Sequence, residues 1–515
     1  TGAEQQMTFH KQFDVKSLDA SNDAIVYEQG GYLHLLDPKT ATSKQLAIEV
    51  KGDFTFARPR WEEVSARNWQ NVQVSATGKR ALMEYRGEIF TIPKENGTWR
   101  NLTNSLGEAD RYPVWSPKGD QIAWFSDKNG EYELQLADQQ GNISRSYALP
   151  NPTFYFQPVW SPDASHIAYT DTDYNIWVLN LASGQASKVD TDRYAHPNRA
   201  MNPVWSPDSK WLTYARQLES HFKAAFAYEV ATGKRIQLTD GMADVITPVW
   251  DQNGKYLYFL ASTDYGLNSG WLDMSSYDPR VNRSLYCLVL ADNENTPTMV
   301  ESDEEEVAEK EEKAGEEEEE KGVKVQIDEA GLSGRIVALG LVDGNYIGLM
   351  NAPAGSIFVF EGNDNGPGAN LHQYKLEDRK AELFLEGIRD AQTNFDGTQL
   401  LYNKGSNWYL VGAKGKPKSG DGQLSADVKV KLDPKAEYHQ IFKEGWRYMR
   451  DFLYVDNVHG APWDKVYEWY APWIDHVRHR TDLNYVVDIM SGEVAIGHSY
   501  VSGGDMPDTD RVPGG

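Results

Sequence analysis

The chain has 515 residues, with 51 Lys or Arg against 76 Asp or Glu, and a formal net charge of −25. Such an acidic surface repels phosphate backbones and anionic lipid, so we expect no nucleic acid and no membrane as partners. No run of about 18 apolar residues occurs, which argues against a membrane-spanning helix. The single cysteine, Cys287, excludes an intrachain disulfide. We expect a cytoplasmic protein, with a periplasmic location as the alternative.

The first 52 residues contain two short alternating runs, at residues 24–27 and 33–36, that predict β-strands. The stretch 54–67 then breaks the spacing of the repeats that follow. We interpret residues 1–52 as the end of a preceding propeller, with an extra blade of the next one as the alternative. Because the chain opens on Thr-Gly-Ala-Glu-Gln-Gln, without Met or a signal peptide, we expect further sequence upstream.

Four tryptophans recur at intervals of 45 residues, each within a variant of Val-Trp-Ser-Pro-Asp-Gly: Trp115, Trp160, Trp205 and Trp250. A constant period of this length indicates one copied supersecondary unit. In the first copy, residues 116–119 form a predicted turn, and residues 121–125, 133–137 and 146–149 form predicted strands. About four strands in ~40 to 45 residues are typical of a propeller blade. Helical repeats would need apolar residues at i, i+3, i+4 and i+7, which these segments lack.

Weaker copies begin near Val74 and Phe395, and residues 335–341 with 345–349 supply strands for one degenerate unit between them. The tally is seven units. The predicted fold is therefore mainly β, with a seven-bladed β-propeller over residues 53–432.

Residues 301–321 contain thirteen Asp or Glu and three Lys. A block of like charge cannot bury apolar surface, so we expect a disordered, solvated insertion in a blade loop. A spacer is favoured over an acidic docking tail, because a charge run carries no geometry of its own.

After residue 432 the apolar spacing becomes helical. The pattern predicts helices over residues 441–453 and 463–477, the second kinked or divided by Pro472. A third helix is predicted to open with Thr481 as its cap and to end near Gly492. Residues 433–505 are thus expected to form a small helical domain.

Three segments of this domain carry a family resemblance. They are Phe-Lys-Glu-Gly-Trp-Arg-Tyr-Met-Arg-Asp-Phe-Leu-Tyr at residues 442–454, Asn-Val-His-Gly-Ala-Pro-Trp at residues 457–463, and His-Ser-Tyr-Val-Ser-Gly-Gly-Asp at residues 498–505. They resemble the first catalytic subdomain of the tricorn protease family, and the upstream blades are similar to the seven-bladed propeller of the same family. Propeller and helical module also occur in the family's order.

The resemblance implies an S41-type serine peptidase that degrades oligopeptides, with the propeller as substrate filter or channel. It also implies peptide substrates, a homo-oligomer, and neither cofactor nor metal. His498 aligns with the family's general base. The nucleophilic serine follows a PDZ-like domain in the family, so we expect it outside this chain, with residues 506–515 starting the linker toward that domain. The chain alone should be inactive, and substrate-binding residues are not identified.

The sequence itself also gives no complete set of serine-hydrolase residues. A serine hydrolase needs a base within reach of the serine Oγ and a third group that orients the base. Ser499 is adjacent to His498 along the chain, where a productive contact is hard to arrange, and no G-x-S-x-G elbow occurs. Family members often have serine directly before the histidine, whereas this chain has Gly497. The ring of His498 would then be oriented by another group or by water.

The other histidines, including His459, His476 and His479, are interpreted as structural, since a pair without nearby carboxylates is a weak zinc signal.

Two other functions compete with the peptidase interpretation. A TolB-like propeller would be a protein-docking platform without chemistry, and the helical module counts against it. A propeller-gated peptidase of the prolyl oligopeptidase kind would need a nucleophile elbow and parallel strands downstream, where residues 436–490 indicate helices instead.

Overall fold

The computed structural model describes residues 2, 4–195, 201–263, 281–299, 322–364, 366–425 and 427–507. The chain forms two compact units, one from Thr1–Glu62 with Lys431–Gly515 and the other from Glu63–Val430. The predicted acidic insertion at residues 301–321 lies outside the described residues, as does most of the predicted linker at 506–515. No helix within the described ranges is long and apolar enough to cross a membrane.

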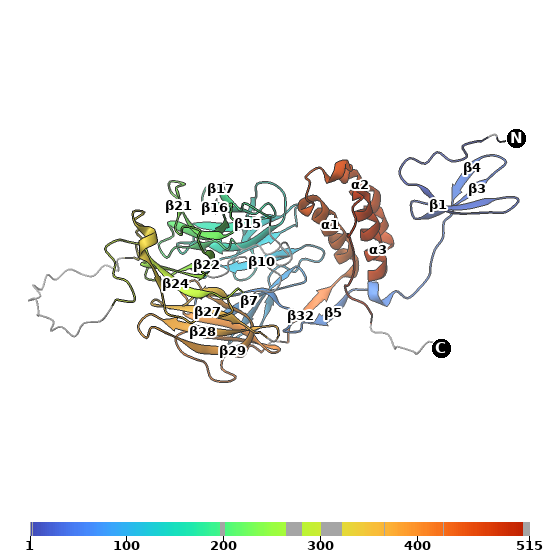
Figure 1. Ribbon diagram of the computed structural model, residues 1–515. Helices are drawn as coiled ribbons and strands as arrows, with labels where there is room; N and C mark the ends of the chain where they lie inside the picture. Colours follow the sequence, from blue (N-terminus) through green and yellow to red (C-terminus); the bar gives the residue numbers. More distant parts are fainter. Residues whose placement is uncertain are drawn as a thin grey trace, which may run out of the picture. The chain divides into compact units, whose positions relative to one another are not determined.

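The larger unit is built from antiparallel sheets whose strands follow one another in chain order (Figure 1). Its first two four-stranded sheets consist of β6 (Gln70–Val74), β7 (Arg80–Tyr85), β8 (Glu88–Pro93) and β9 (Arg100–Asn101), and of β10 (Asp110–Trp115), β11 (Ile122–Ser126), β12 (Glu133–Ala137) and β13 (Ile143–Ala148). The next two consist of β14 (Tyr155–Trp160), β15 (His166–Asp171), β16 (Asn175–Asn180) and β17 (Ala186–Thr191), and of β18 (Val204–Trp205), β19 (Trp211–Gln217), β20 (Lys223–Glu229) and β21 (Arg235–Gln237). The fifth contains β22 (Asp244–Trp250), β23 (Tyr256–Ser262), β24 (Ser284–Val289) and β25 (Ile336–Ala338).

The last sheet has six strands and serves two blades. It runs through β26 (Tyr346–Asn351), β27 (Ser356–Gly362), β28 (Ala369–Lys375), β29 (Lys380–Thr393), β30 (Gln399–Lys404) and β31 (Asn407–Gly412). The first part of β29 pairs with β28, and its second part, from Ile388 on, pairs with β30. One long strand is therefore the outer strand of the sixth blade and the inner strand of the seventh.

The inner strands of the sheets close into a ring. Among the described residues, β6, β10, β14, β18, β22, β26 and β29 contact one another in that order, and β29 returns to β6. This cyclic order confirms the predicted fold class of a mainly β, seven-bladed propeller followed by helices. The compact unit itself runs from Glu63 to Val430.

The repeated tryptophans are buried between blades, at 2–8% exposure. Three of them donate Nε1–H to a carbonyl of the preceding blade, Trp160 to Val114, Trp205 to Val159 and Trp250 to Val204, at 3.4, 3.0 and 3.2 Å. Trp115 instead donates to the carbonyl of Gly119 in its own turn, at 3.2 Å. All four occupy the same place in their strands, paired with Ile122, Ile167, Leu212 and Leu257, so Trp115 differs only in the acceptor of its indole N–H.

The degenerate unit predicted from residues 335–341 and 345–349 is divided differently in the structure. The first run, as β25, pairs with β24 and completes the fifth blade. The second run overlaps β26, which begins the sixth. The sequence could not separate them, because a short apolar strand does not reveal its partner; a short 3-10 helix, η3 (Leu332–Arg335), leads into β25.

The smaller unit combines an N-terminal sheet with a helical module. The sheet contains β1 (Val15–Ala20), β2 (Ile25–Gln29), β3 (Tyr32–Asp37) and β4 (Thr42–Gln45), followed by the 3-10 turn η1 (Thr55–Ala57). Strands β5 (Arg60–Glu63) and β32 (Lys429–Leu432) pair where the chain crosses between the units. That the N-terminal sheet ends a preceding propeller stays a prediction.

The helical module contains α1 (Pro434–Phe452), α2 (Trp463–Tyr470) and α3 (Arg480–Ser491), with 3-10 turns η4 (Val458–Gly460), η5 (Ala471–His476) and η6 (Gly492–Val494). α1 begins earlier than its apolar face indicated, because Asp433 caps the amides of Lys435 and Ala436, with Pro434 in the first turn. Pro472 divides α2 from η5 as predicted. The apolar faces of all three helices share one core.

The predicted cap of α3 is wrong by two residues. His479, rather than Thr481, is the N-cap: its Nδ1 accepts from the Thr481 amide at 3.2 Å, and the Asp482 carboxylate accepts from the His479 amide at 3.1 Å. The sequence rule favours hydroxyl and carboxylate caps, whereas here an imidazole takes that place. His479 is therefore structural, as expected.

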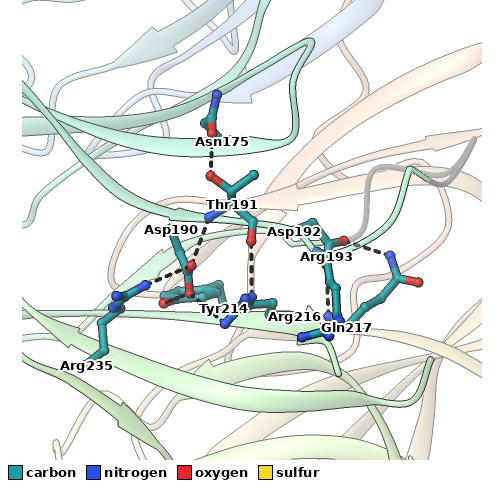
Figure 2. A network of polar contacts seen from close by, with 9 residues as sticks. All are labelled: Asn175, Asp190, Thr191, Asp192, Arg193, Tyr214, Arg216, Gln217 and Arg235. Carbon is teal, nitrogen blue, oxygen red and sulfur yellow. Dashed lines mark hydrogen bonds and ion pairs between the residues drawn. The ribbon is translucent and has the colours of Figure 1, made fainter. Parts of the chain in front are cut away.

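A polar network joins the third and fourth blades (Figure 2). The Asp190 carboxylate at the end of β17 is 4% exposed as a side chain and accepts from the Tyr214 hydroxyl at 2.7 Å and from Arg235 Nη1 at 2.9 Å. Arg216 lies 3.6 Å from the same carboxylate and donates to the Thr191 carbonyl at 3.1 Å. Burial, followed by the nearby Asp190 charge, raises the pKa of Tyr214, so this hydroxyl keeps its proton and remains a donor.

Replacing Asp190 with alanine should destabilise the propeller by about 3 kcal/mol, because it leaves a buried hydroxyl and two guanidinium groups without their shared acceptor. Urea unfolding measures the loss. Glu219→Ala is the matched control, since Glu219 is 87% exposed and 3.7 Å from Arg193; it should change the unfolding free energy by less than about 0.5 kcal/mol. Equal effects of the two substitutions would contradict a structural role for the network.

Candidate active site and propeller channel

The segment that carries His498 leaves the end of α3 through η6, where Val494 is fully buried. Ala495 then takes a left-handed conformation and directs the chain away from the helix, with φ of 58°. Ile496 and Val501 pack against the core of the helical module on either side of His498. The histidine thus sits at the tip of a short loop whose two flanks are held by apolar contacts.

The far flank of this loop is tied to α3. Asn484 Nδ2 donates to the Gly503 carbonyl at 3.0 Å, and its Oδ1 accepts from Arg480 Nε at 2.9 Å. Gly504 has φ of 93°, and a side chain at this position would collide with the Arg480 guanidinium. Only glycine permits both the backbone angle and this close approach.

The near flank is held by His459. Its Nδ1 lies 3.0 Å from the Val494 carbonyl and its Nε2 lies 2.7 Å from the Tyr454 hydroxyl. Both ring nitrogens are therefore engaged, and His459 joins the loop after α1 to the segment before His498. It is a structural residue, as the sequence analysis expected.

His498 itself is exposed and has φ of 61°. Within the described part of the chain its imidazole makes one hydrogen-bond contact, between Nδ1 and the Tyr500 hydroxyl at 3.4 Å. No described hydrogen bond joins the ring to Ser499 or to a carboxylate. The loop therefore holds a histidine whose Nε2 is open, without a nucleophile or an acid beside it.

Sequence reasoning did not identify Tyr500 as a partner of this histidine. The tyrosine is 81% exposed and its ring meets the imidazole edge-on, with centroids 6.2 Å apart. The sequence shows a tyrosine hydroxyl two residues after the histidine. It does not show the left-handed backbone of His498, which directs the two side chains to one side.

In the larger unit, two cavities of about 310 and 300 Å³ lie at the axis of the ring. The first is lined by residues from all seven inner strands: Val74, Trp115, Trp160, Trp205, Trp250, Asn351 and Thr393 represent one strand each. The two cavities share wall residues, among them Gln73, Pro158 and Gln392. Because they share these residues, the two cavities adjoin, and together they are called the propeller channel.

No group of three His, Cys, Asp or Glu side chains in the described ranges is placed to hold a metal ion. Cys287 is buried, and burial raises its pKa, so the thiol stays protonated and unreactive.

The chain is a seven-bladed propeller protein with a helical module that carries an exposed histidine loop. Comparison with known proteins identifies its family. The model of the tricorn protease second β-propeller domain matches residues 69–414, and that of the tricorn protease C1 domain matches residues 434–492. The chain belongs to the tricorn protease family.

Relatives in other organisms agree. The tricorn protease homolog of Saccharolobus solfataricus is 24% identical over 296 residues, covering 55% of this chain and 26% of that protein. The tricorn protease of Thermoplasma acidophilum is 24% identical over 146 residues, covering 28% of this chain and 14% of that protein. The crystal structure of the tricorn protease superposes with a TM-score of 0.75 at 16% identity, covering 96% of this chain and 48% of that one. The chain spans less than half the length of each.

The two glycines that flank His498 at positions 497 and 504 should respond differently to alanine. Gly504→Ala should release the loop, because it strains the backbone and displaces Arg480. A Cβ added at Gly497 has no neighbour within 4 Å, so Gly497→Ala should leave the loop in place. Hydrogen exchange of residues 495–503 measures the release, and protection should fall at least tenfold in Gly504→Ala alone. Equal protection in both variants would contradict the anchoring role of Gly504.

Proposed function

We propose that this chain supplies the substrate channel and the general base of a tricorn-like serine peptidase that degrades oligopeptides. His498 is the base, and the nucleophilic serine comes from outside the residues of this chain. The observation that carries the proposal is the position of His498 on an anchored loop six residues after the C1-domain match ends at residue 492, with no described hydrogen bond at Nε2.

The chemistry follows from the two ring nitrogens. A general base must present an unprotonated nitrogen to the serine hydroxyl, take its proton on attack and return it to the leaving amine. If Nδ1–H donates to the Tyr500 oxygen, the lone pair of Nε2 faces outward and can accept that proton. Tyr500 then acts as a positioning residue that favours the productive tautomer, in the place of the serine that family members often carry before the histidine.

The propeller channel supports the role of a filter. Its walls come from all seven inner strands, so its width is fixed by the ring and not by one flexible loop. A cavity of about 300 Å³ accommodates an extended peptide segment and rejects a folded domain. This role also favours the peptidase over a docking platform, for which the helical module would have no use.

His498→Ala should lower kcat by about 10⁴ in the peptidase assembled from this chain and the serine-bearing region, because the serine loses its proton acceptor. KM should stay within a few-fold, and the melting temperature should not change, since His498 is exposed. Steady-state hydrolysis of a fluorogenic peptide measures both constants.

His476→Ala is the control for this experiment. His476 lies 3.4 Å from the Tyr32 hydroxyl and has no described hydrogen bond to residues 495–505, so its loss should leave kcat within about twofold. The assignment of His498 is wrong if its alanine variant hydrolyses the peptide within tenfold of the parent rate.

Tyr500→Phe tests the positioning role separately. It removes the only described hydrogen-bond partner of the imidazole while keeping the ring contact, so kcat should fall about three- to tenfold with KM unchanged. A fall in kcat at unchanged KM separates positioning of the base from substrate binding. An unchanged kcat would indicate that Tyr500 does not orient His498.

A further inference from the structure

Near the propeller channel, each blade has a residue at the same count from the end of its inner strand. Five of these residues have a left-handed backbone and no strand partner, whereas Gly348 and Asp390 pair with the second strand. In every blade, the last residue of the inner strand pairs with a residue of the second strand, as Trp115 does with Ile122 and Thr393 with Leu400. Counting back three residues from this last pair gives the ring positions: Asn71, Tyr112, Gln157, Asn202, Thr247, Gly348 and Asp390. Of these, Asn71, Tyr112, Gln157, Asn202 and Asp390 line the smaller of the two cavities.

Six of the seven ring positions are uncharged, and so are the other walls. In a chain where 25% of the residues are charged, Asp390 is the one charged residue that lines either cavity within the described ranges. The remaining polar walls are largely carboxamides, including Gln73, Gln392 and Asn394. Carboxamides can donate to and accept from a peptide backbone irrespective of its sequence.

A buried carboxylate near the ring is already occupied. Glu84 is 5% exposed and accepts from the Asn71 side chain at 2.7 Å and from the Tyr112 amide at 2.9 Å. It lies behind these two ring residues and does not line the cavities. Glu84 therefore supports the wall, whereas Asp390 faces the lumen.

Asp390 has no cationic partner in the described part of the chain. The strand register shifts at Arg389, between Ile388 and Asp390, and no described ion pair joins Arg389 to the Asp390 carboxylate. The side chain is exposed to the lumen, yet the surrounding wall removes much of its water, and this desolvation raises the pKa of Asp390. A cation placed in the channel would restore the lost stabilisation of the carboxylate.

We propose that Asp390 determines the charge specificity of the propeller channel by binding the α-ammonium group of an incoming peptide. The inference rests on the proposed peptide-filter function. The neutral carboxamide walls accept any extended backbone, and the single carboxylate of the ring pairs with the one positive charge that every unmodified peptide carries at its N-terminus. Peptides with a blocked N-terminus enter with lower affinity.

The test uses the full chain and two octapeptides of Gly, Ser and Ala, each with an amidated C-terminus and a fluorophore near that end. One has a free α-amine and the other is N-acetylated. Fluorescence anisotropy at low ionic strength should give about five- to tenfold tighter binding of the free amine by the parent protein. Asp390→Asn should bring both peptides to the affinity of the acetylated one, and high salt should reduce the preference in the parent.

Glu386→Gln is the matched control. Glu386 is an exposed acid on the same strand that does not line the channel, so its loss changes the net charge equally and should preserve the preference. Gly348→Asp adds a second carboxylate to the ring at a position where a Cβ has its nearest neighbours at 3.9 Å, and it should strengthen the preference. Melting curves of the three variants verify that the ring is intact.

Two outcomes separate this inference from the function on which it rests. If the parent binds both peptides equally, or if the preference survives Asp390→Asn, Asp390 does not select the ammonium group and the filter proposal stands. If the parent binds neither peptide, the filter proposal fails and the role of Asp390 fails with it. A preference lost equally in Glu386→Gln would assign the effect to the overall acidic field.

Discussion

A propeller blade can bury the two faces of its sheet only against its neighbours, so every part of this molecule depends on the closure of the ring. The seventh blade meets the first without exchanging a strand: the first contains β6 to β9, and the last uses β29 to β31. Closure instead relies on contacts between the two blades, in which Trp408 Nε1 donates to the Ala66 carbonyl at 2.9 Å and Asn394 Nδ2 donates to the Ala76 carbonyl at 2.8 Å. We call the contact between two adjacent blades a seam. The seam between the last and first blades resembles the other seams, because a tryptophan or amide donates to a carbonyl of the adjacent blade.

The seams differ in chemistry where the repeat has diverged. Three rely on the indole of the repeated tryptophan, whereas the seam between the third and fourth blades adds the buried Asp190 network. Between the fifth and sixth blades, Asp251 accepts from the Tyr258 hydroxyl at 2.6 Å and from the Gly355 amide at 3.0 Å. Since each seam carries its own polar contacts, the order of the blades is fixed by more than apolar burial.

Closure of the ring also creates a channel whose described walls carry little of the chain's charge. The chain carries a net charge of −25, whereas the described channel walls are carboxamides, prolines and apolar side chains with a single carboxylate. A largely uncharged wall offers mainly hydrogen bonds and apolar contacts to a molecule in the channel, so the single carboxylate of Asp390 dominates its electrostatics. The exposed loop of His498 is held at Val494 and at Gly503, and no described hydrogen bond joins its imidazole to a serine or a carboxylate. Filter and base are therefore proposed as parts of one peptidase.

The sequence alone determined the features that local spacing encodes. The 45-residue period fixed the blade, because turn, proline and tryptophan recur together; the apolar spacing after residue 432 fixed the helices, and Pro472 fixed the division between α2 and η5. Tertiary structure decided what depends on partners distant in the chain. It assigned β25 to the fifth blade, made His479 the cap of α3 and brought Tyr500 to His498 through a left-handed backbone. It also placed Asp390 among six uncharged counterparts, since only the closed ring aligns residues that lie up to 319 positions apart in the sequence.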